Sequence, residues 1–208
     1  AVLKRKEGEP ATGIKAVDDA YDYLGDTYNF YNLRFGRDGI DDTGGTLYAY
    51  VGLSELNAFY IGDNTMLFNN LFITDDVTAH ELTHGVTDTD VGFVYFGFSG
   101  ALSEMYSDWG GELVDLTNGK GNDSPAVRWF CAEEFTIKIR DQRGGTGDED
   151  EEDPIDDTLP GIRYMKDPTV FGDPDRLGSP LLRNPYSMVD SGGVHSNSGV
   201  GNKLVYLL

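Results

Sequence analysis

The stretch His80-Glu81-Leu82-Thr83-His84 indicates a metal-binding helix, and the rest of the fold is read outward from it. It contains two of the chain's three histidines, four residues apart. On an α-helix, such residues lie on one face about a turn apart, so both imidazoles can bind the same metal ion. Glu81 lies beside that face and is poorly placed to bind the metal. It is therefore a candidate general base for a water molecule that the metal activates.

A third ligand is expected downstream, because a catalytic zinc ion takes three protein ligands and leaves one position open for water. Glu104 follows His84 by twenty residues, and Asp108 lies one helical turn after Glu104. Asp108 can accept a hydrogen bond from a zinc-bound histidine and so orient its ring. Position 90, where the metzincin pattern has a third histidine, holds Asp90, which excludes that arrangement. Taken alone, His80 and His84 also fit packing or surface residues.

The third histidine, His195, lies in a glycine-rich stretch between Asp190 and Gly199. An isolated histidine in such a stretch is usually structural or exposed. The other two histidines of this acidic chain lie in a metal-binding pattern, so we interpret His195 as functional as well. An imidazolium held by Asp190 can donate a hydrogen bond to the oxyanion that forms when water attacks a peptide carbonyl.

Composition excludes several classes of protein. The 208 residues include 36 acidic and 16 basic ones, which gives a net charge of -20. Such a charge disfavours binding to nucleic-acid phosphates and to anionic membranes. No apolar run is long enough for a transmembrane helix, and no apolar signal core follows the basic start of the chain. The single cysteine, Cys131, excludes an internal disulfide and is expected to be a small buried residue.

Helical and strand patterns alternate along the chain. The expected elements are a helix over 17–31, strands over 47–53 and 57–61, a short apolar segment over 66–73, a helix from Thr74 or Asp75 that Gly85 interrupts near its end, a helix from Ser99 to about Leu116, and a C-terminal helix over 199–208 that enters the core.

An acidic segment at about 141–158 differs from the rest of the chain. Six consecutive acids run from Asp148 to Asp153, and Asp156 and Asp157 follow. A solvated insertion is the plainest interpretation. Calcium binding is the alternative, because carboxylate oxygens suit this cation, but the run lacks the spacing of a defined calcium site.

Four separated blocks, at 57–60, 76–88, 99–108 and 192–203, resemble the thermolysin-like neutral zinc metalloendopeptidases. The resemblance extends from the helix near Tyr21 to the last residues. It implies an α+β fold with two lobes and a zinc site in the cleft between them. The first lobe, residues 1–88, is β-rich and ends in the helix of the zinc motif. The second, residues 89–208, is mainly helical and carries the acidic insertion. Members of the family are usually longer, so the chain looks shortened at both ends.

The resemblance implies the roles of the residues around the zinc ion. His80, His84 and Glu104 match its three ligands, and Glu81 matches the base that also shuttles the proton. Asp108 matches the partner that orients a zinc-bound histidine. The groups that stabilise the oxyanion match Tyr95 and the pair His195 and Asp190.

The resemblance also implies how a peptide substrate binds. Asn57 and the backbone of Ala58 match an edge strand that pairs with an extended substrate. Arg163 matches an arginine that grips a carbonyl beyond the cut. Four apolar residues are candidates for the pocket of the residue after the cut, which favours cleavage before a bulky hydrophobic residue, and plain core packing is the alternative for them. They are Phe68, Leu71, Val77 and Ile162.

Calcium is the second cofactor that the resemblance implies. The candidate ligands are Asp76, Asp115, Asp123, Glu133 and Glu134. Two positions depart from the family pattern without removing a catalytic group. Ser103 replaces an asparagine beside the third zinc ligand, and Tyr60 replaces a tryptophan.

The sequence therefore predicts an extracellular zinc endopeptidase whose signal and propeptide are not part of this chain. Its expected partners are peptide or protein substrates, and neither nucleic acid nor membranes. Two alternatives stay open. One is a non-catalytic metal-binding fragment of such a protease, which the short length favours. The other is a zinc aminopeptidase, but no Gly-x-Met-Glu-Asn-like stretch precedes His80 to hold a free amine.

Overall fold

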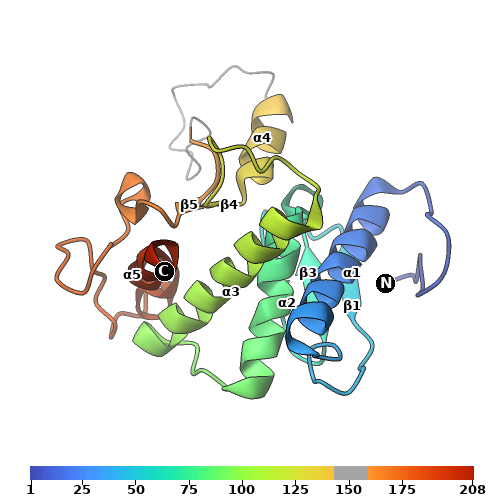
Figure 1. Ribbon diagram of the computed structural model, residues 1–208, viewed down its shortest axis with the longest axis horizontal. Coiled ribbons are helices and arrows are strands. Elements are labelled where there is room, and N and C mark those ends of the chain that lie inside the picture. Colours follow the sequence, from blue (N-terminus) through green and yellow to red (C-terminus); the bar gives the residue numbers. More distant parts are fainter. Residues whose placement is uncertain (143–158) are drawn as a thin grey trace.

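The computed structural model describes residues 1–142 and 159–208. Four long helices lie side by side in the order α1, α2, α3 and α5, so that α3 packs between α2 and α5 (Figure 1). They span Lys15–Phe35 (α1), Asp75–Asp90 (α2), Gly97–Asn118 (α3) and Asp190–Leu207 (α5). A shorter helix, α4 (Glu133–Gln142), follows the loop after α3. This packing brings the two central helices, which carry the zinc motif and the candidate third ligand, into contact.

A small sheet packs against the first helices. Its strands are β1 (Tyr48–Val51), β2 (Ala58–Tyr60) and β3 (Thr65–Phe68), in the order β1-β3-β2. The central strand β3 pairs parallel to β1 and antiparallel to β2, which leaves β2 at an edge of the sheet. A second pair of strands, β4 (Phe130–Cys131) and β5 (Arg163–Tyr164), is antiparallel, and two 3₁₀ helices, η1 (Asn70–Phe72) and η2 (Pro168–Phe171), complete the described fold.

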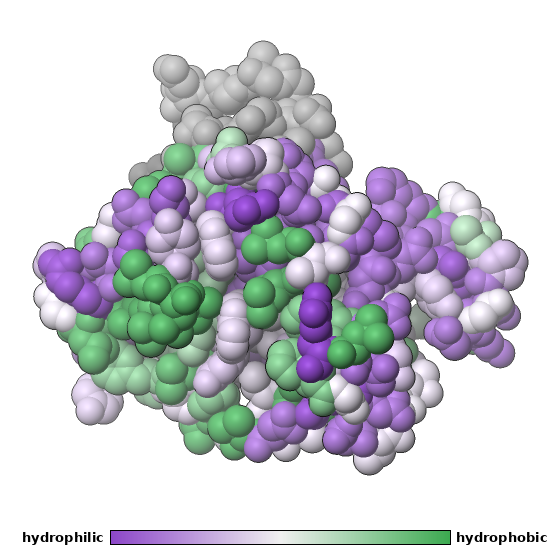
Figure 2. Space-filling view, in the orientation of Figure 1, coloured by the Kyte–Doolittle hydropathy of each residue, from purple (hydrophilic) through white to green (hydrophobic). Residues whose placement is uncertain are grey.

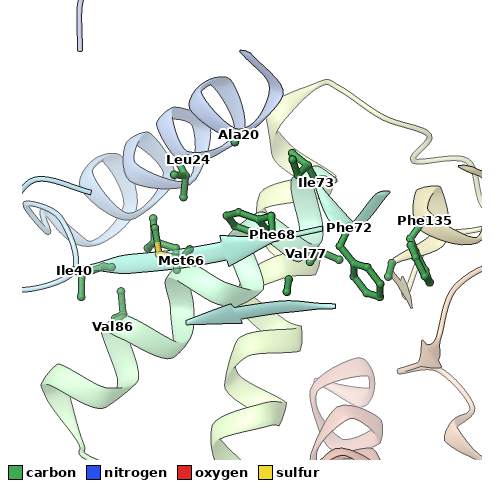
Figure 3. Close-up of a cluster of buried hydrophobic side chains, with 13 residues drawn as sticks. Ala20, Leu24, Ile40, Met66, Phe68, Phe72, Ile73, Val77, Val86 and Phe135 are labelled. Carbon is green, nitrogen blue, oxygen red and sulfur yellow. The ribbon is translucent and has the colours of Figure 1, made fainter. Parts of the chain in front are cut away.

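The main hydrophobic core lies between α1, the three-stranded sheet and α2 (Figure 3). Met66 and Phe68 of β3 are fully buried in it, and Leu82 and Val86 of α2 pack against them. Burying one such side chain contributes roughly 1.5–3 kcal/mol. The core therefore holds α2, and with it the zinc motif, against a rigid sheet.

The start of α2 was predicted correctly, but the predicted interruption of this helix at Gly85 was wrong. Thr74 caps the helix, where its hydroxyl accepts a hydrogen bond from the Val77 N–H at 3.4 Å. The helix then continues through Gly85 to Asp90. A Cβ on Gly85 would lie 2.8 Å from the Cδ1 atom of Ile40 and 3.0 Å from the ring of Tyr60. This glycine therefore allows close packing on the helix and does not end it.

The C-terminal helix begins earlier than the sequence predicted, at Asp190 and not at residue 199. Ser191, Gly192 and Gly193 have positive φ angles of 47°, 88° and 74°, so the chain makes a tight left-handed kink before the regular helix. A Cβ on Gly193 would lie 2.5 Å from the Cβ of Arg183, which explains a glycine at this position. The kink folds Asp190 back towards the first turn of the helix.

The surface is largely polar, with hydrophobic surface over the end of α5, where Leu204, Leu207 and Leu208 are exposed (Figure 2). Among the described residues, no helix combines the length and apolarity needed to cross a membrane. The expected helices at 17–31 and from Ser99, and the strands at 47–53 and 57–61, are confirmed with small shifts of their ends. Most of the acidic segment, residues 143–158, lies outside the described residues.

Candidate active site

Three side chains from α2 and α3 converge on one point. The Nε2 atoms of His80 and His84 lie 3.0 Å apart, and the Glu104 carboxylate lies 3.5 Å from the first and 3.2 Å from the second. A zinc ion with ligand distances of about 2.1 Å in a tetrahedron requires its ligand atoms to be roughly 3.3–3.4 Å apart. The three donors therefore already have the spacing of a zinc site.

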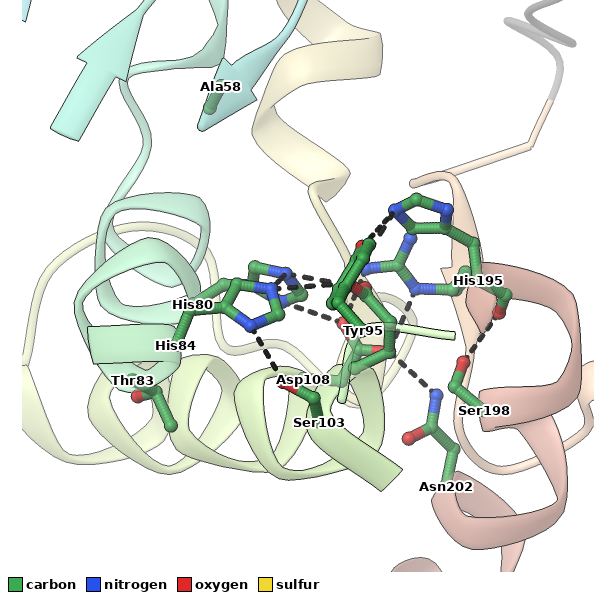
Figure 4. A network of polar contacts seen from close by, with 12 residues as sticks. Ala58, His80, Thr83, His84, Tyr95, Ser103, Asp108, His195, Ser198 and Asn202 are labelled. Carbon is green, nitrogen blue, oxygen red and sulfur yellow. Dashed lines mark hydrogen bonds and ion pairs between the residues drawn. The ribbon is translucent and has the colours of Figure 1, made fainter. Parts of the chain in front are cut away.

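Both histidine rings are oriented by hydrogen bonds from their other nitrogen (Figure 4). His80 Nδ1 lies 3.0 Å from Asp108 Oδ1, and His84 Nδ1 lies 3.1 Å from the Ser103 hydroxyl. If each Nδ1 carries the proton, as these partners favour, both Nε2 lone pairs point at the same place. Two lone pairs at this distance repel each other unless a cation lies between them.

Glu104 has the charge and the free atom that a metal ligand needs. It is fully buried, and its Oε2 atom has no hydrogen-bond partner. Burial opposes its ionisation, but the hydrogen bond and the positive charge of His84 outweigh burial and hold the pKa of Glu104 well below its ordinary value. A buried carboxylate with an orphaned oxygen fits a metal ligand, so the residues present fit zinc.

Asp108 forms the second layer of the site. It accepts hydrogen bonds from both Nε and Nη2 of Arg163, the former at 2.8 Å, and from the Asn202 amide, also at 2.8 Å. Burial opposes ionisation of Asp108, but the charge of Arg163 and the contact with His80 outweigh it and lower the pKa of Asp108. A fixed anion is thereby placed behind His80.

Glu81 lies in the cleft that the zinc motif borders. This cleft has a volume of about 730 Å³, and both histidines, Glu104 and Glu81 line it. The side chain of Glu81 comes from the residue after His80 on α2 and is only 7% exposed. It is thus positioned beside the metal site without belonging to the ligand set.

Tyr95 and His195 approach the metal site from the other side of the cleft. The Tyr95 hydroxyl donates a short hydrogen bond to Glu104 and lies 3.3 Å from His195 Nε2 (Figure 4). Burial and the charge of Glu104 raise the pKa of Tyr95, so its hydroxyl keeps its proton. Two hydrogen-bond donors can therefore reach the same region of the cleft.

Asp190 favours the charged form of His195. Its carboxylate lies 2.5 Å from His195 Nδ1 and also accepts the backbone N–H of His195 at 3.1 Å. Burial lowers the pKa of His195, but the hydrogen bond to Asp190 and the charge of Glu104 outweigh burial and raise this pKa above its ordinary value. The kink at the start of α5 makes this short-range contact possible.

The residues expected to bind substrate separate into two groups. Asn57, Ala58, Val77, Ile162 and Arg163 line the cleft. Phe68 is instead fully buried in the core, and Leu71 packs against that core, so the plain core alternative describes both. Phe72, Cys131 and Ala132 border the cleft as well.

A second acidic cluster lies behind the metal site. Asp76, Asp115 and Glu133 are buried, and Asp115 Oδ1, Glu133 Oε2 and Asp123 Oδ1 have no hydrogen-bond partner. Burial, and then the neighbouring carboxylates, raise the pKa values of Asp115 and Glu133. Unpaired carboxyl oxygens are the ligand type that calcium takes, but among the described residues only His80, His84 and Glu104 bring their ligand atoms within 4.8 Å of one another.

The cluster gains one member. Glu112 was missed in the sequence, and burial and the charges of Asp76 and Asp123 raise its pKa to about 8. It lies two turns after Glu104 on α3, and this spacing is the signal that could have found it. Glu134 lies beside Asp115, because a Cβ on Gly121 would be 3.3 Å from both Glu134 Oε1 and Asp115 Oδ1. Burial, and then the charge of Asp75, raise the pKa of Glu134.

Comparisons with known proteins agree with this geometry. The family model of the thermolysin metallopeptidase catalytic domain matches residues 6–88, and that of the thermolysin metallopeptidase alpha-helical domain matches residues 91–208. The chain is 36% identical to a zinc metalloproteinase of Renibacterium salmoninarum, over 98% of this chain and 37% of the relative. It is also 36% identical to an extracellular metalloprotease of Pectobacterium carotovorum, over 99% of this chain and 58% of the relative.

A solved structure, the precursor of protealysin from Serratia proteamaculans, superimposes with a TM-score of 0.72. It is 31% identical and covers 98% of this chain and 62% of its own. The chain therefore belongs to the thermolysin family of metallopeptidases. This family uses a catalytic zinc ion and calcium. The chain spans between 37% and 58% of the length of three curated relatives that it matches.

Proposed function

We propose that this chain forms the catalytic cleft of an extracellular zinc-dependent endopeptidase. The observation that carries the proposal is the convergence of His80, His84 and Glu104, whose donor atoms all lie within 4.8 Å of one another. A structural zinc site closes all four positions with protein ligands, whereas here three ligands open onto a cleft. An open position leaves room for water and a substrate carbonyl.

The proposed reaction is the attack of water on an internal peptide bond. Zinc, when bound by these ligands, polarises the scissile carbonyl and lowers the pKa of a water molecule. Glu81 takes the proton of that water as it attacks the carbonyl carbon. Tyr95 and His195 donate hydrogen bonds to the oxyanion that develops on the former carbonyl oxygen. Glu81 then passes its proton to the leaving amine as the C–N bond breaks, and no covalent bond to the enzyme forms.

Substrates are proposed to bind as extended peptides. Strand β2 is an edge strand, and Asn57 and Ala58 at its start line the cleft, which supports pairing with a substrate backbone. Beyond the metal, Val77 and Ile162 give the cleft apolar walls. We infer a preference for cleavage before bulky hydrophobic residues, with Arg163 near the carbonyl that follows the cut.

Calcium is proposed to occupy the acidic cluster of Asp76, Glu112, Asp115, Asp123 and Glu133. The unpaired oxygens of Asp115, Asp123 and Glu133 and the raised pKa values of Glu112, Asp115 and Glu133 support this assignment, because a cation would replace the protons that these buried carboxyls otherwise retain. Glu134 belongs to the candidate set as well, because its Oε1 atom and Asp115 Oδ1 lie beside the same glycine, Gly121. The backbone N–H of Ala132, a residue that lines the cleft, donates a hydrogen bond to Asp76. Calcium bound by Asp76 would therefore also stabilise this wall of the cleft.

The alternative function is a non-catalytic metal-binding fragment of a longer protease. The share of its relatives that the chain spans favours this alternative. The presence of Glu81, Tyr95 and His195 around the metal site argues against it, since metal binding alone requires none of them. The proposed extracellular location is supported by relatives that are named extracellular proteases, such as the Pectobacterium carotovorum metalloprotease.

The test is hydrolysis of an internally quenched peptide with blocked ends by the 208-residue chain. Wild type and Glu81→Gln are compared after zinc is loaded to one equivalent. We expect wild type to cleave, and chelation or the substitution to abolish cleavage while Glu81→Gln still binds zinc. A zinc-loaded, folded wild type that cleaves nothing would favour the fragment. Cleavage by the variant at the wild-type rate would remove Glu81 from the mechanism.

A further inference from the structure

The C-terminal helix reaches the metal site through one buried amide. Asn202 of α5 is 1% exposed, and its Nδ2 atom donates a hydrogen bond to Asp108 Oδ2 at 2.8 Å (Figure 4). Asp108 contacts the Nδ1 atom of His80 with its other oxygen. An ionised carboxylate only accepts hydrogen bonds, so the nitrogen of the amide must face it. One carboxylate therefore separates Asn202 from a candidate zinc ligand.

Asp108 depends on donors from three elements. His80 of α2 and one arm of Arg163 contact Oδ1, while the Nε atom of Arg163 and Asn202 contact Oδ2. Arg163 grips both oxygens from one side, and this bidentate contact already restricts the carboxylate. Asn202 adds a donor from α5 and fixes Oδ2. Fixing Oδ2 also fixes the position of Oδ1 in the same carboxylate, and Oδ1 in turn orients the His80 ring.

The other atom of the amide suggests why an asparagine is present. Asn202 Oδ1 is buried and has no hydrogen-bond partner. An unpaired buried oxygen costs free energy, and an apolar side chain would pack between α5 and α3 without that cost. The donor to Asp108 is the one interaction of this side chain that an apolar residue cannot supply.

We propose that Asn202 is a positioning residue that couples the docking of α5 to the zinc affinity of the site. The inference rests on the proposed zinc site but not on catalysis. Coupling is reciprocal, so zinc must stabilise the docked helix as much as the docked helix strengthens zinc binding. Removing the Asp108 contact breaks the link and leaves both helices folded.

The chain contains a matched control on the same helix. Asn197 is 3% exposed and lies about a turn and a half earlier on α5. Among the described residues, its side chain hydrogen bonds to the backbone of Arg183 and Gly192, and to neither Asp108 nor a candidate zinc ligand. Asn197→Ala therefore removes a buried amide from α5 without touching the proposed link.

The first experiment measures the zinc dissociation constant by competition with a chromophoric chelator, using the 208-residue chain. Asn202→Ala and Asn202→Asp are compared with wild type and with Asn197→Ala, and each value is corrected for the folded fraction. We expect a constant about 10-fold higher for both Asn202 variants, the low end of the loss for groups that hydrogen-bond directly to a metal ligand, because Asp108 lies between Asn202 and His80. Asn202→Asp places a second carboxylate next to Asp108 and can prevent folding. In that case, Asn202→Ala alone tests the inference.

The second experiment measures hydrogen exchange of the α5 amides with and without zinc. In wild type and Asn197→Ala, zinc should slow exchange in α5; in Asn202→Ala, zinc should still protect α2 but no longer α5. Zinc affinity within about 2-fold of wild type for Asn202→Ala, or an equal loss for Asn197→Ala, would overturn the inference. A folded wild type that binds no zinc would instead refute the proposed function.

Discussion

The contact between Ser103 and His84 departs from the family pattern in its chemistry and keeps its geometry. The hydroxyl lies 3.1 Å from His84 Nδ1, where an amide oxygen of asparagine would serve as the acceptor. Ser103 is 6% exposed, so no bulk water replaces a lost partner. The contact orients the ring of His84, a candidate zinc ligand.

We predict that Ser103→Ala weakens zinc binding by about 10-fold, because the His84 ring loses its orienting partner. Ser103→Asn should restore most of the affinity, since its side chain offers the same kind of acceptor. Competition with a chelator measures both constants. Equal affinity of Ser103→Ala and wild type would show that His84 is held by packing alone.

Tyr95→Phe tests the oxyanion donor without changing the shape of the ring. We expect kcat to fall by about 100-fold with little change in KM, because the hydroxyl acts on charge that develops only in the transition state. Steady-state hydrolysis of a quenched peptide separates the two constants. A raised KM at unchanged kcat would instead place Tyr95 in ground-state binding.

The zinc ligands could be predicted from sequence because their spacing is local. His80 and His84, and likewise Glu104 and Asp108, are one helical turn apart, and the period of a helix alone brings each pair to one face. Asn202 gives no such signal, since it meets Asp108 from 94 residues away. The packing of α5 against α3 brings Asn202 to Asp108, and no local sequence pattern predicts this packing.

Helices α2 and α3 pack closely enough that one glycine between them has no room for a methyl group. A Cβ on Gly110 of α3 would lie 2.3 Å from Thr83 Oγ1 and 3.0 Å from the Tyr31 hydroxyl. Those two hydroxyls share a hydrogen bond of 2.8 Å that ties α1 to α2. Three helices therefore meet at this point.

Gly110→Ala should lower the free energy of unfolding by about 1–3 kcal/mol, because the methyl group forces the helices apart. Gly25→Ala is the control, since its Cβ would meet no atom within 4 Å in the middle of α1. That substitution should raise stability by about 0.5–1 kcal/mol. Urea unfolding gives both values, and a stable Gly110→Ala would mean that the interface relaxes at no cost.

Elements were predicted well where periodicity is strong and poorly where glycine has two meanings. Gly85 reads as a helix end, but tertiary packing of Ile40 against the helix requires it. The glycines at 192 and 193 read as a loop, yet they form the kink that starts α5. Sequence shows that a glycine is present but not which of its properties is used.

At the scale of the whole molecule, the net charge of -20 is partly buried in the acidic cluster. Burial and mutual repulsion raise the pKa of Glu112 to about 8, and those of Asp115 and Glu133 in the same direction. Without a cation, the folded chain therefore keeps protons that the unfolded chain releases above about pH 4. This difference links stability to pH.

We predict that the stability of the metal-free chain falls as the pH rises from about 5 to about 8. The folded state binds more protons than the unfolded state over this interval. Each extra proton therefore lowers the free energy of unfolding by about 1.4 kcal/mol for every pH unit of increase. Calcium replaces these protons, and the stability that it adds should grow with pH. Urea unfolding at several pH values, with and without millimolar calcium, measures the difference.

Glu112→Gln provides the control for this prediction. It removes one titrating group, so the pH dependence of the metal-free chain should flatten and the effect of calcium should shrink. A calcium effect that is independent of pH, or absent, would show that the cluster does not exchange protons for the cation.

Overall architecture was predicted through the family resemblance rather than from composition. The division into lobes at residue 88 stays a prediction, as do the roles of the substrate-binding residues. Phe68 and Leu71 show why: an apolar residue near a cleft and one in the core look alike in sequence. Only the packing of the folded chain shows that Phe68 of β3 and Leu71 of η1 belong to the core.

The unpaired edge of β2 has a consequence for which proteins this cleft can cut. A substrate must present several residues in an extended conformation with free backbone groups, and folded domains keep such segments paired or covered. Digestion of a folded target would then proceed through its locally opened forms, and its rate would report the target's own opening equilibrium. The selectivity of the proposed protease would then depend as much on the local flexibility of the substrate protein as on the side chains that the cleft accepts.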